Sequence, residues 1–432
     1  MRRVFEQGAW ADRALRGEAE RLGLDARERA LATRLAYGTV QRRATLDHLI
    51  EAFAGRSTAR LQPPVLAAVR LGLLQLCFLD GIPARAAVDQ SVHLARAEAP
   101  AATGLVNAVL RRAAREGRAM LAALGDETPE QAALKHSHPP WLAHMWWQQL
   151  GPQAARALLA RDNEPAEAAV RVNTLRGAPE AVRAALEVET VPAPGLPEGL
   201  VLGGAFDVHG SAAFARGELM PQSRAAMRVA RLLVPEPGQR VLDLCAAPGA
   251  KTTHLAALMR GEGEIVAVER HPGRAAALQR TAARMGAEDC VRVELGDAAT
   301  ARPPGDQYDR VLVDPPCSDL GTLQSRPDAR WRRGPEDLTR LALLQGQILA
   351  VGAAALRPGG VLVYSVCTIS AQEGEQVVAA LLADRPELSV DDLRREGEPV
   401  WEHPCVPEFV QSLPHRDGTD GFFVARLRRS AP

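Results

Sequence analysis

Between residues 219 and 430, short apolar runs alternate with longer segments whose apolar residues recur every three or four positions. Short runs bounded by Gly, Pro or polar residues are typical of buried strands, and the periodic segments between them are typical of helices. Strands that alternate with helices predict an α/β domain with a doubly wound parallel sheet. The strands are expected at residues 240–244, 264–268, 291–295, 309–313 and 361–366, with helices between them, for example at 273–285 and 335–355.

The first 125 residues carry helical periodicity alone. Apolar positions recur at helical spacing in residues 24–35, 46–53 and 65–77. Breaks fall at Pro63-Pro64, at Gly81-Ile-Pro83 and at Gly104. We therefore expect an all-α domain at residues 1–125.

Residues 126–218 predict a small α+β connector domain. Thr128-Pro-Glu-Gln131 is a capping-box pattern with Pro at the first helical position. A strand at 170–172, a helix at 179–186 and short strands between Pro and Gly turns follow. Arg171-Val-Asn-Thr-Leu-Arg176 allows two interpretations, a contact with RNA or a strand edge with two solvated arginines.

Composition narrows the class of protein. The length of 432 residues is consistent with about three domains, and 47% apolar residues support large buried cores. No apolar run reaches the ~20 residues of a membrane span, and the first residues lack the apolar stretch of a signal peptide. The six cysteines form no Cys-x-x-Cys pair, so we expect neither disulfides nor a metal site. We expect a cytoplasmic monomer.

Charge is distributed unevenly along the chain. The net charge is zero, which argues against an indiscriminate polyanion binder. Residues 1–125, however, hold 19 Arg and no Lys against 12 Asp and Glu. A solvated helical surface would explain single arginines, but a surplus confined to one domain favours a module that follows an RNA backbone. The arginines cluster at Arg42, Arg43, Arg56, Arg60, Arg111 and Arg112.

The stretch Val241-Leu-Asp-Leu-Cys-Ala-Ala-Pro-Gly-Ala-Lys-Thr252 predicts a strand, a tight turn and a helix. Such a turn brings a helix N-terminus to the carboxyl edge of a parallel sheet, where ligands bind. Ala250 between Gly249 and Lys251 rules out a P-loop, and a single Gly rules out the dinucleotide fingerprint.

An acidic residue follows this loop at the distance expected for a ribose contact. Glu269 ends the next apolar run, about twenty residues on, where it can accept hydrogen bonds from both hydroxyls of a ribose. One nucleoside without a pyrophosphate suggests S-adenosyl-L-methionine. The alternative is a core strand followed by an ordinary turn. Lys251 is one of only two lysines among 52 basic residues, a weak hint that this loop needs a compact ammonium.

Reactive side chains follow the later strands. Asp297 follows the third strand, Asp314-Pro-Pro-Cys317 follows the fourth, and Cys367 follows the fifth. A single cysteine at a strand end is usually a small buried hydrophobe. Two cysteines on adjacent strand ends, one beside an Asp, indicate chemistry at the carboxyl edge of the sheet.

The residue after Asp-Pro-Pro narrows the substrate. Methyltransferases of exocyclic amino groups have an aromatic residue there, whereas this chain has a thiol, Cys317. Carbon 5 of a pyrimidine is a poor nucleophile, and addition of a thiolate to carbon 6 converts the ring into an enamine that can attack a methyl sulfonium. A carboxyl group at ring N3 would favour the addition, and a second base must later remove the C5 proton. These arguments leave open which cysteine attacks.

The catalytic part resembles a known family. Cys245-Ala-Ala-Pro-Gly-Ala-Lys-Thr252, Asp314-Pro-Pro-Cys317, Tyr364-Ser-Val-Cys367 and Asp420-Gly-Phe-Phe-Val-Ala-Arg-Leu427 are similar to motifs of the RNA cytosine-C5 methyltransferases of the Nol1/Nop2/Sun group. The resemblance covers residues 170–430. It implies a Rossmann-like methyltransferase domain in which Cys367 is the nucleophile, Cys317 assists product release, and Asp314 contacts both base and cofactor. The cofactor-binding residues that it implies are Cys245, Ala246, Ala247, Pro248, Gly249, Ala250, Lys251, Glu269, Asp297 and Asp314.

The amino-terminal part resembles the NusB-like RNA-binding helical domain. The resemblance lies in Arg34-Leu-Ala-Tyr-Gly-Thr-Val-Gln-Arg-Arg43, Leu71-Gly-Leu-Leu-Gln-Leu76, Ile82-Pro83 with Ala87-Val-Asp-Gln-Ser-Val-His-Leu-Ala95, and Leu105-Val-Asn-Ala-Val-Leu-Arg-Arg112. With this domain in front, the chain is similar to the members that act on one cytosine of 16S rRNA, so small-subunit ribosomal RNA is the implied partner.

Departures from the family pattern leave every reacting group in place. Ala250 stands where Gly is common, Glu269 where Asp is common, and Val366 where Thr is usual. The segment Gln222-Ser-Arg-Ala-Ala226 is less acidic than its family counterpart, which leaves that edge of the cofactor pocket least defined. Two other functions remain open: the same reaction on tRNA, and a non-catalytic assembly factor on a degenerate methyltransferase scaffold.

Overall fold

The computed structural model describes residues 2–300, 307–393 and 401–431. The chain divides into two compact units, each described by itself below. The first consists of Met1–Pro165 together with Leu323–Arg332, and the second of Ala166–Thr322 with Arg333–Pro432. The domain boundaries expected after residues 125 and 218 stay predictions.

The first unit is helical, as the periodicity of residues 1–125 predicts. Helix α5 starts at Pro63-Pro64, where Pro suits the first turn, and contributes buried side chains such as Val69 and Leu73 to a core shared with α4, α6 and α7. The capping box at Thr128 is confirmed at the start of α8. The helices are α1 (Arg2–Phe5), α2 (Ala11–Leu22), α3 (Ala26–Gln41), α4 (Arg43–Ala54), α5 (Pro63–Phe78), α6 (Ala84–Glu98), α7 (Thr103–Ala122), α8 (Pro129–Lys135), α9 (Pro140–Leu150), α10 (Pro152–Arg161) and α16 (Ala329–Arg332), with 3-10 turns at Thr58–Arg60 and Pro100–Ala102.

The arginines of this unit do not form one exposed patch. Arg42 lies over the ring of Phe78 and Arg43 over that of Trp331, at 4.8 and 5.5 Å from the ring centroids. Burial lowers the pKa of both guanidinium groups, so both belong to the packing of the unit. The clustered arginines on the surface are Arg56, Arg60, Arg111 and Arg112.

Leu323–Arg332 belongs to the helical unit although its sequence neighbours belong to the second one. Arg330 is fully buried there and donates hydrogen bonds to the carbonyl oxygens of Ser137 and Asp162 and to Oδ1 of Asn163. Trp331 Nε1 donates to a carbonyl oxygen of α3, that of Val40, at 2.7 Å. The sequence had placed this segment in the α/β domain.

The second unit contains a small four-stranded antiparallel sheet. Its strand order is β2-β3-β1-β4, and the strand expected at 170–172 is β1. The expected helix is shorter than predicted and ends at Ala184. The elements are β1 (Ala169–Val172), β2 (Thr190–Pro192), β3 (Gly199–Leu202), β4 (Leu219–Pro221), α11 (Pro179–Ala184) and α12 (Ala212–Ala215).

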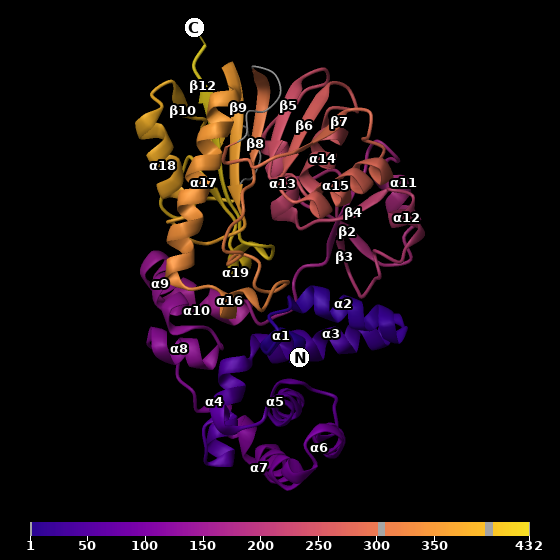
Figure 1. The fold of residues 1–432 in the computed structure, drawn as a ribbon, viewed down its shortest axis with the longest axis vertical. Coiled ribbons are helices and arrows are strands. Elements are labelled where there is room, and N and C mark those ends of the chain that lie inside the picture. The colour runs from indigo at the N-terminus through magenta and orange to yellow at the C-terminus, as the bar shows by residue number, and fades with distance from the viewer. Residues whose placement is uncertain (1, 301–306, 394–400, 432) are drawn as a thin grey trace. The chain divides into compact units, whose positions relative to one another are not determined.

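An eight-stranded sheet forms the rest of the unit (Figure 1). Strands β5 to β9 are mutually parallel, in the order β9-β8-β5-β6-β7, which confirms the doubly wound prediction. The carboxyl-terminal strand β12 inserts antiparallel between β9 and β10, which makes the sheet mixed. The strands are β5 (Arg240–Leu244), β6 (Glu264–Glu269), β7 (Val291–Leu295), β8 (Tyr308–Val313), β9 (Leu356–Val366), β10 (Leu388–Val390), β11 (Val410–Gln411) and β12 (Phe423–Arg429).

Alternate residues of the central strands face two helical layers. Val241, Ile265 and Leu312 pack with α13, α14 and α15, whereas Leu242, Val266 and Val311 pack with α17 and α18. The period of two along each strand explains this division. The helices are α13 (Arg224–Leu232), α14 (Ala250–Leu258), α15 (Pro272–Met285), α17 (Pro335–Ala355), α18 (Glu375–Asp384) and α19 (Pro414–Asp417).

Helix α17 is, within the described residues, the one helix long and apolar enough for a membrane span by length and composition. Leu338, Leu341, Ile348 and Leu349 are buried and recur at helical spacing. Ile348 and Leu349 pack in the same core cluster as the strands, so α17 is a core helix of this unit.

The sequence Ser370-x-x-Glu373 matches a capping-box pattern and predicts a cap for the helix after the fifth strand, but this prediction is wrong. Helix α18 begins at Glu375 with Gly374 as its N-cap, and no side chain caps it. The side chain of Glu373 instead contacts the loop that follows β8. A sequence pattern cannot distinguish a local cap from a carboxylate with partners far away in the chain.

Candidate active site

The register of the parallel strands places the predicted residues at one edge of the sheet. Leu244 pairs with both Val268 and Val313, and Val313 pairs with Tyr364. The residues that follow these positions therefore leave the sheet side by side. They are Cys245, Glu269, Asp314 and, a little beyond Tyr364, Cys367.

The loop after β5 has an unusual backbone. Cys245 lies in the left-handed region with φ 66°, and Gly249 has φ 102°. A Cβ on Gly249 would lie 2.6 Å from Leu278, so only Gly fits between this loop and α15. Helix α14 begins at the next residue, Ala250, and its first N–H groups lie at the edge of the sheet.

Cys245 lies in this loop but is poorly suited to act as a nucleophile. Burial, followed by the charges of Asp314, Asp243 and Glu269, raises the pKa of its thiol to about 12. The thiolate is the reactive form, so Cys245 stays an unreactive thiol at neutral pH. This leaves the two cysteines singled out by the sequence.

Glu269 and Arg274 connect the loop with the end of β6. The Glu269 side chain is 3% exposed, and its Oε1 accepts a hydrogen bond from the backbone N–H of His271 at 2.9 Å. Arg274 donates to the carbonyl oxygen of Ala247 at 2.7 Å and lies 3.5 Å from Glu269. Asp297, half-buried after β7, accepts from the N–H of Ala299 and lies 3.6 Å from Arg270.

Lys251 and Asp314 form an ion pair. Lys251 Nζ lies 2.6 Å from Oδ2 of Asp314, while Ser365 Oγ donates to Oδ1 at 2.8 Å. Burial disfavours the ammonium, but the charge of Asp314 and its hydrogen bond outweigh burial and raise the pKa of Lys251. The ammonium and the hydroxyl therefore hold both oxygens of Asp314 in place.

Two buried groups near the loop were not assigned to this site from the sequence. Asp243 in β5 accepts a hydrogen bond from Thr252 Oγ1 at 2.7 Å, and burial raises the pKa of its carboxyl to about 7. Arg171, fully buried, donates to Gln222 at 2.9 Å and to Thr253 at 3.0 Å. Arg171 therefore supports the helix after the loop. Its burial in the central strand β1 contradicts both interpretations for this residue, the RNA contact and the solvated strand edge, whereas Arg176 is exposed.

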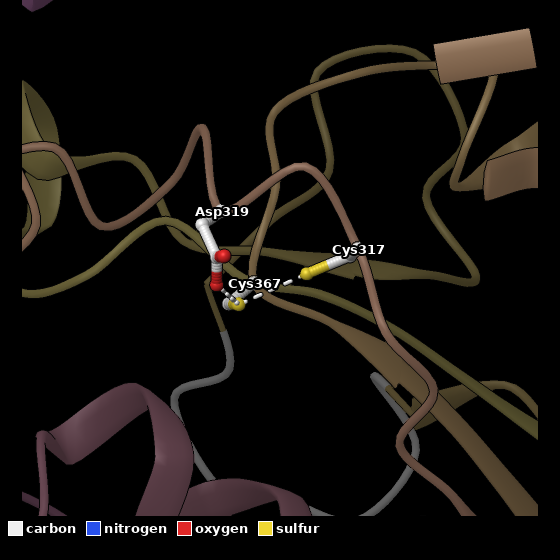
Figure 2. A group of neighbouring side chains, drawn as sticks. All are labelled: Cys317, Asp319 and Cys367. Atoms are coloured by element: carbon white, nitrogen blue, oxygen red, sulfur yellow. Dashed lines mark hydrogen bonds between the residues drawn. The ribbon is translucent and has the colours of Figure 1, made fainter. Parts of the chain in front are cut away.

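The two remaining cysteines meet at this edge (Figure 2). Cys317 Sγ and Cys367 Sγ lie 3.0 Å apart, and Asp319 Oδ1 lies 3.3 Å from Cys367 Sγ. Cys317 is 7% exposed and Cys367 is half-buried. Asp319 has φ 62°, and this left-handed turn directs its carboxylate back toward the thiols, which sequence alone could not reveal.

The donor atoms of Cys317, Asp319 and Cys367 all lie within 4.8 Å of one another. Thiolates and carboxylates at such distances are ligands that zinc accepts. The thiols also lie beside the Lys251–Asp314 pair, an arrangement suited to covalent chemistry on a bound base. The expectation that the protein holds no metal stays a prediction.

Backbone contacts fix the loop that carries Cys317. Arg333 donates to the carbonyl oxygens of Cys317 and Ser318, each at 3.2 Å. Gly321 N–H donates to the carbonyl oxygen of Cys367 at 3.0 Å, which joins the two cysteine segments. A Cβ on Gly321 would lie 1.8 Å from the carbonyl oxygen of Gly421, so the Asp420-Gly421 turn requires Gly at 321.

Family models match most of the chain. A model described as the NusB family matches residues 1–115, and a model described as the ferredoxin-like domain of the RsmF/B-like methyltransferases matches residues 138–209. A model described as 16S rRNA methyltransferase RsmB/F matches residues 230–428. The helical, α+β and Rossmann-like parts of the chain thus each have a counterpart.

Two relatives match over more than nine tenths of their length. A probable ribosomal RNA small subunit methyltransferase B of Synechocystis sp. is 34% identical over 440 residues, covering 100% of this chain and 98% of the relative. The ribosomal RNA small subunit methyltransferase B of Thermus thermophilus is 38% identical over 422 residues, covering 97% and 92%.

Solved structures share the fold. The crystal structure of PH0851 has a TM-score of 0.79 at 28% identity, covering 94% of this chain and 91% of that chain. NSun6 from Pyrococcus horikoshii, solved with SFG, has a TM-score of 0.62 at 23% identity and covers 68% and 99%. At the lower identity the likeness concerns the fold alone.

Proposed function

The chain belongs to the family of 16S rRNA methyltransferases RsmB/F, and from this membership we propose that it transfers a methyl group from S-adenosyl-L-methionine to carbon 5 of a 16S rRNA cytosine through a covalent bond between Cys367 and carbon 6. The membership supports a methyltransferase of small-subunit rRNA. The position on the base, the cofactor and the covalent step are our proposals.

The residues around the loop fit this cofactor. The buried Glu269 carboxylate lies at the end of β6, where it would accept hydrogen bonds from ribose hydroxyls. The N-terminus of α14 would bind the carboxylate of the methionine moiety, and Asp297 lies after the next strand. When bound, the cofactor supplies a methyl group activated by a sulfonium.

The Lys251–Asp314 pair supports activation of the base. A carboxyl group beside the thiols that donates a hydrogen bond or a proton to ring N3 draws electron density away from carbon 6. Cys367 can pass its thiol proton to Asp319 Oδ1, 3.3 Å away, and form its sulfur–carbon bond at C6 while the electron pair of the double bond moves to C5. C5 then bonds the methyl group, whose bond to the sulfonium breaks with the electron pair kept by that sulfur. Lys251 and Ser365 keep Asp314 oriented during this step.

Release of the product requires loss of the C5 proton. Its bonding electrons re-form the C5–C6 double bond, and the Cys367 sulfur leaves with the pair of the S–C6 bond. Cys317 lies 3.0 Å from Cys367, close enough to assist this elimination by accepting the C5 proton as its thiolate. The short distance between the two thiols is the observation that carries the proposal.

A methylation assay tests the proposal. The purified protein would be incubated with 16S rRNA, tRNA and labelled S-adenosyl-L-methionine, and the RNA mapped by bisulfite sequencing. We expect 5-methylcytosine at one position of 16S rRNA. Methylation of tRNA alone would overturn the proposed substrate, and RNA binding without methyl transfer would favour the assembly-factor alternative. We also propose that the enzyme acts as a cytoplasmic monomer.

A further inference from the structure

Glu373 has no exposed surface and lies in the turn between β9 and α18. Its carboxylate accepts four hydrogen bonds. Oε1 accepts from Ser318 N–H at 2.9 Å and from Gln345 Nε2 at 3.0 Å, and Oε2 accepts from Ser318 Oγ at 2.5 Å and Thr368 Oγ1 at 3.2 Å. We call Glu373, Ser318, Thr368, Gln345 and Tyr364 the Glu373 cluster.

Two members of the Glu373 cluster are direct neighbours of the two cysteines. Ser318 follows Cys317, and Thr368 follows Cys367. Their hydroxyl oxygens lie 2.8 Å apart, and both contact the same carboxylate oxygen. One carboxylate thus holds the two loops together at the residue next to each thiol.

The other members hold Glu373 itself. Gln345 also donates to the carbonyl oxygen of Pro316 at 3.0 Å, so it contacts the cysteine loop from the side of α17. Tyr364 OH donates to the carbonyl oxygen of Glu373 at 2.6 Å and lies 3.3 Å from Oε1 of Gln345. All of these side chains are buried, so water does not compete for their hydrogen bonds.

We propose that Glu373 is a positioning residue that fixes the separation of the Cys317 and Cys367 thiols. The effect of this positioning on catalysis rests on the proposed two-thiol reaction. Loss of the carboxylate leaves the hydroxyl groups of Ser318 and Thr368 and the Ser318 N–H without their shared acceptor. The loops can then separate, and a displacement of about 1 Å between reacting groups can reduce a rate by roughly a hundredfold.

A dithiol reagent measures the thiol separation without any methyl transfer. Phenylarsine oxide binds tightly where two thiols can bond one arsenic atom. Wild type, Glu373→Ala and Glu373→Gln would be titrated in the full-length protein, with bridged peptides located by mass spectrometry and Cys317→Ala as the blank. Glu375→Gln is the matched control, because Glu375 lies two residues away and contacts His403 instead of the cysteine loops.

In Glu373→Ala we expect the affinity for phenylarsine oxide bridging Cys317 and Cys367 to fall by about tenfold or more. We expect kcat to fall by a similar factor, with KM for RNA nearly unchanged. Glu373→Gln keeps one acceptor oxygen and should retain intermediate values of both. Glu375→Gln should match wild type. Wild-type bridging in both Glu373 variants would overturn the positioning role. Lost bridging with full methyl transfer would support the positioning role and overturn the two-thiol mechanism.

Discussion

The Sγ atom of Cys317 lies 3.0 Å from the Sγ atom of Cys367, although fifty positions separate the two residues in the chain. The strands that carry them, β8 and β9, are parallel neighbours, so both cysteines emerge at the same edge of the sheet. At this separation both thiols can reach one pyrimidine. The roles of the two cysteines therefore have to be separated by mutation.

Replacement of the proposed nucleophile, Cys367, should abolish the reaction. We expect Cys367→Ala to eliminate methyl transfer, because no other group would add to carbon 6, while affinity for the cofactor stays nearly unchanged. Filter assays of methyl incorporation and calorimetric titration with S-adenosyl-L-methionine measure the two quantities. Cys405→Ala, which removes an exposed cysteine, serves as the control. Full activity of Cys367→Ala would remove this thiol from the mechanism.

Removal of the second thiol should stop the reaction after methyl transfer. In Cys317→Ala, we expect addition to proceed and elimination to stall, so a protein–RNA adduct accumulates. The adduct should survive a denaturing gel and disappear in the double variant Cys317→Ala/Cys367→Ala. An adduct in Cys367→Ala but not in Cys317→Ala would reverse the two roles, the alternative that the arguments from the residues alone leave open.

The ammonium that pairs with Asp314 should matter for kcat. Lys251→Met keeps much of the side-chain volume and removes the charge 2.6 Å from the Asp314 carboxylate. We expect kcat to fall by about a hundredfold, the typical cost of losing one oriented charge or donor in an active site. The only other lysine, Lys135, pairs with Asp126 in the helical unit, so Lys135→Met is the matched control. Equal rates in both variants would contradict this role.

The sequence predicted those parts of the candidate site whose position depends only on the order of the strands along the chain. Residues that follow parallel strands meet at one edge, so Glu269, Asp314, Cys317 and Cys367 could be placed from the apolar runs before them. The alternation of strands and helices likewise predicted the central sheet. Strand β12 was quoted as a family motif but not assigned as a strand, because the strand pattern alone does not say where an antiparallel strand inserts.

Long-range polar contacts were not predictable. Glu373 matched a local capping pattern, yet its partner Ser318 lies fifty-five positions away. No sequence pattern distinguishes Arg330 from the many other arginines, but it is fully buried in the helical unit. The Asp319 carboxylate reaches Cys367 because the backbone of this non-glycine residue is left-handed. Each case depends on which distant groups the fold brings together.

The buried carboxyl of Asp243 should make stability depend on pH. Burial raises its pKa from the ordinary value of 3.8 to about 7, and the neighbouring charge of Asp314 acts in the same direction. The folded state therefore holds the proton more tightly than the unfolded chain does. As the pH rises from about 4 to about 7, the unfolded chain ionises first, so stability falls by at most about 1.4 kcal/mol per pH unit. Above about pH 7 this contribution stays constant.

Asp243→Asn should remove this dependence, since an amide does not titrate and still accepts the hydrogen bond of Thr252. Urea midpoints measured from pH 4 to pH 8 would report it. We expect the stability of the variant relative to wild type to increase as the pH rises to about 7. Above that pH the difference in stability should stay constant. Asp162 in the helical unit, whose pKa burial also raises to about 7, is present in both proteins and cancels in the difference. A stability difference between the two proteins that does not change from pH 4 to pH 8 would show that Asp243 is ionised throughout this range.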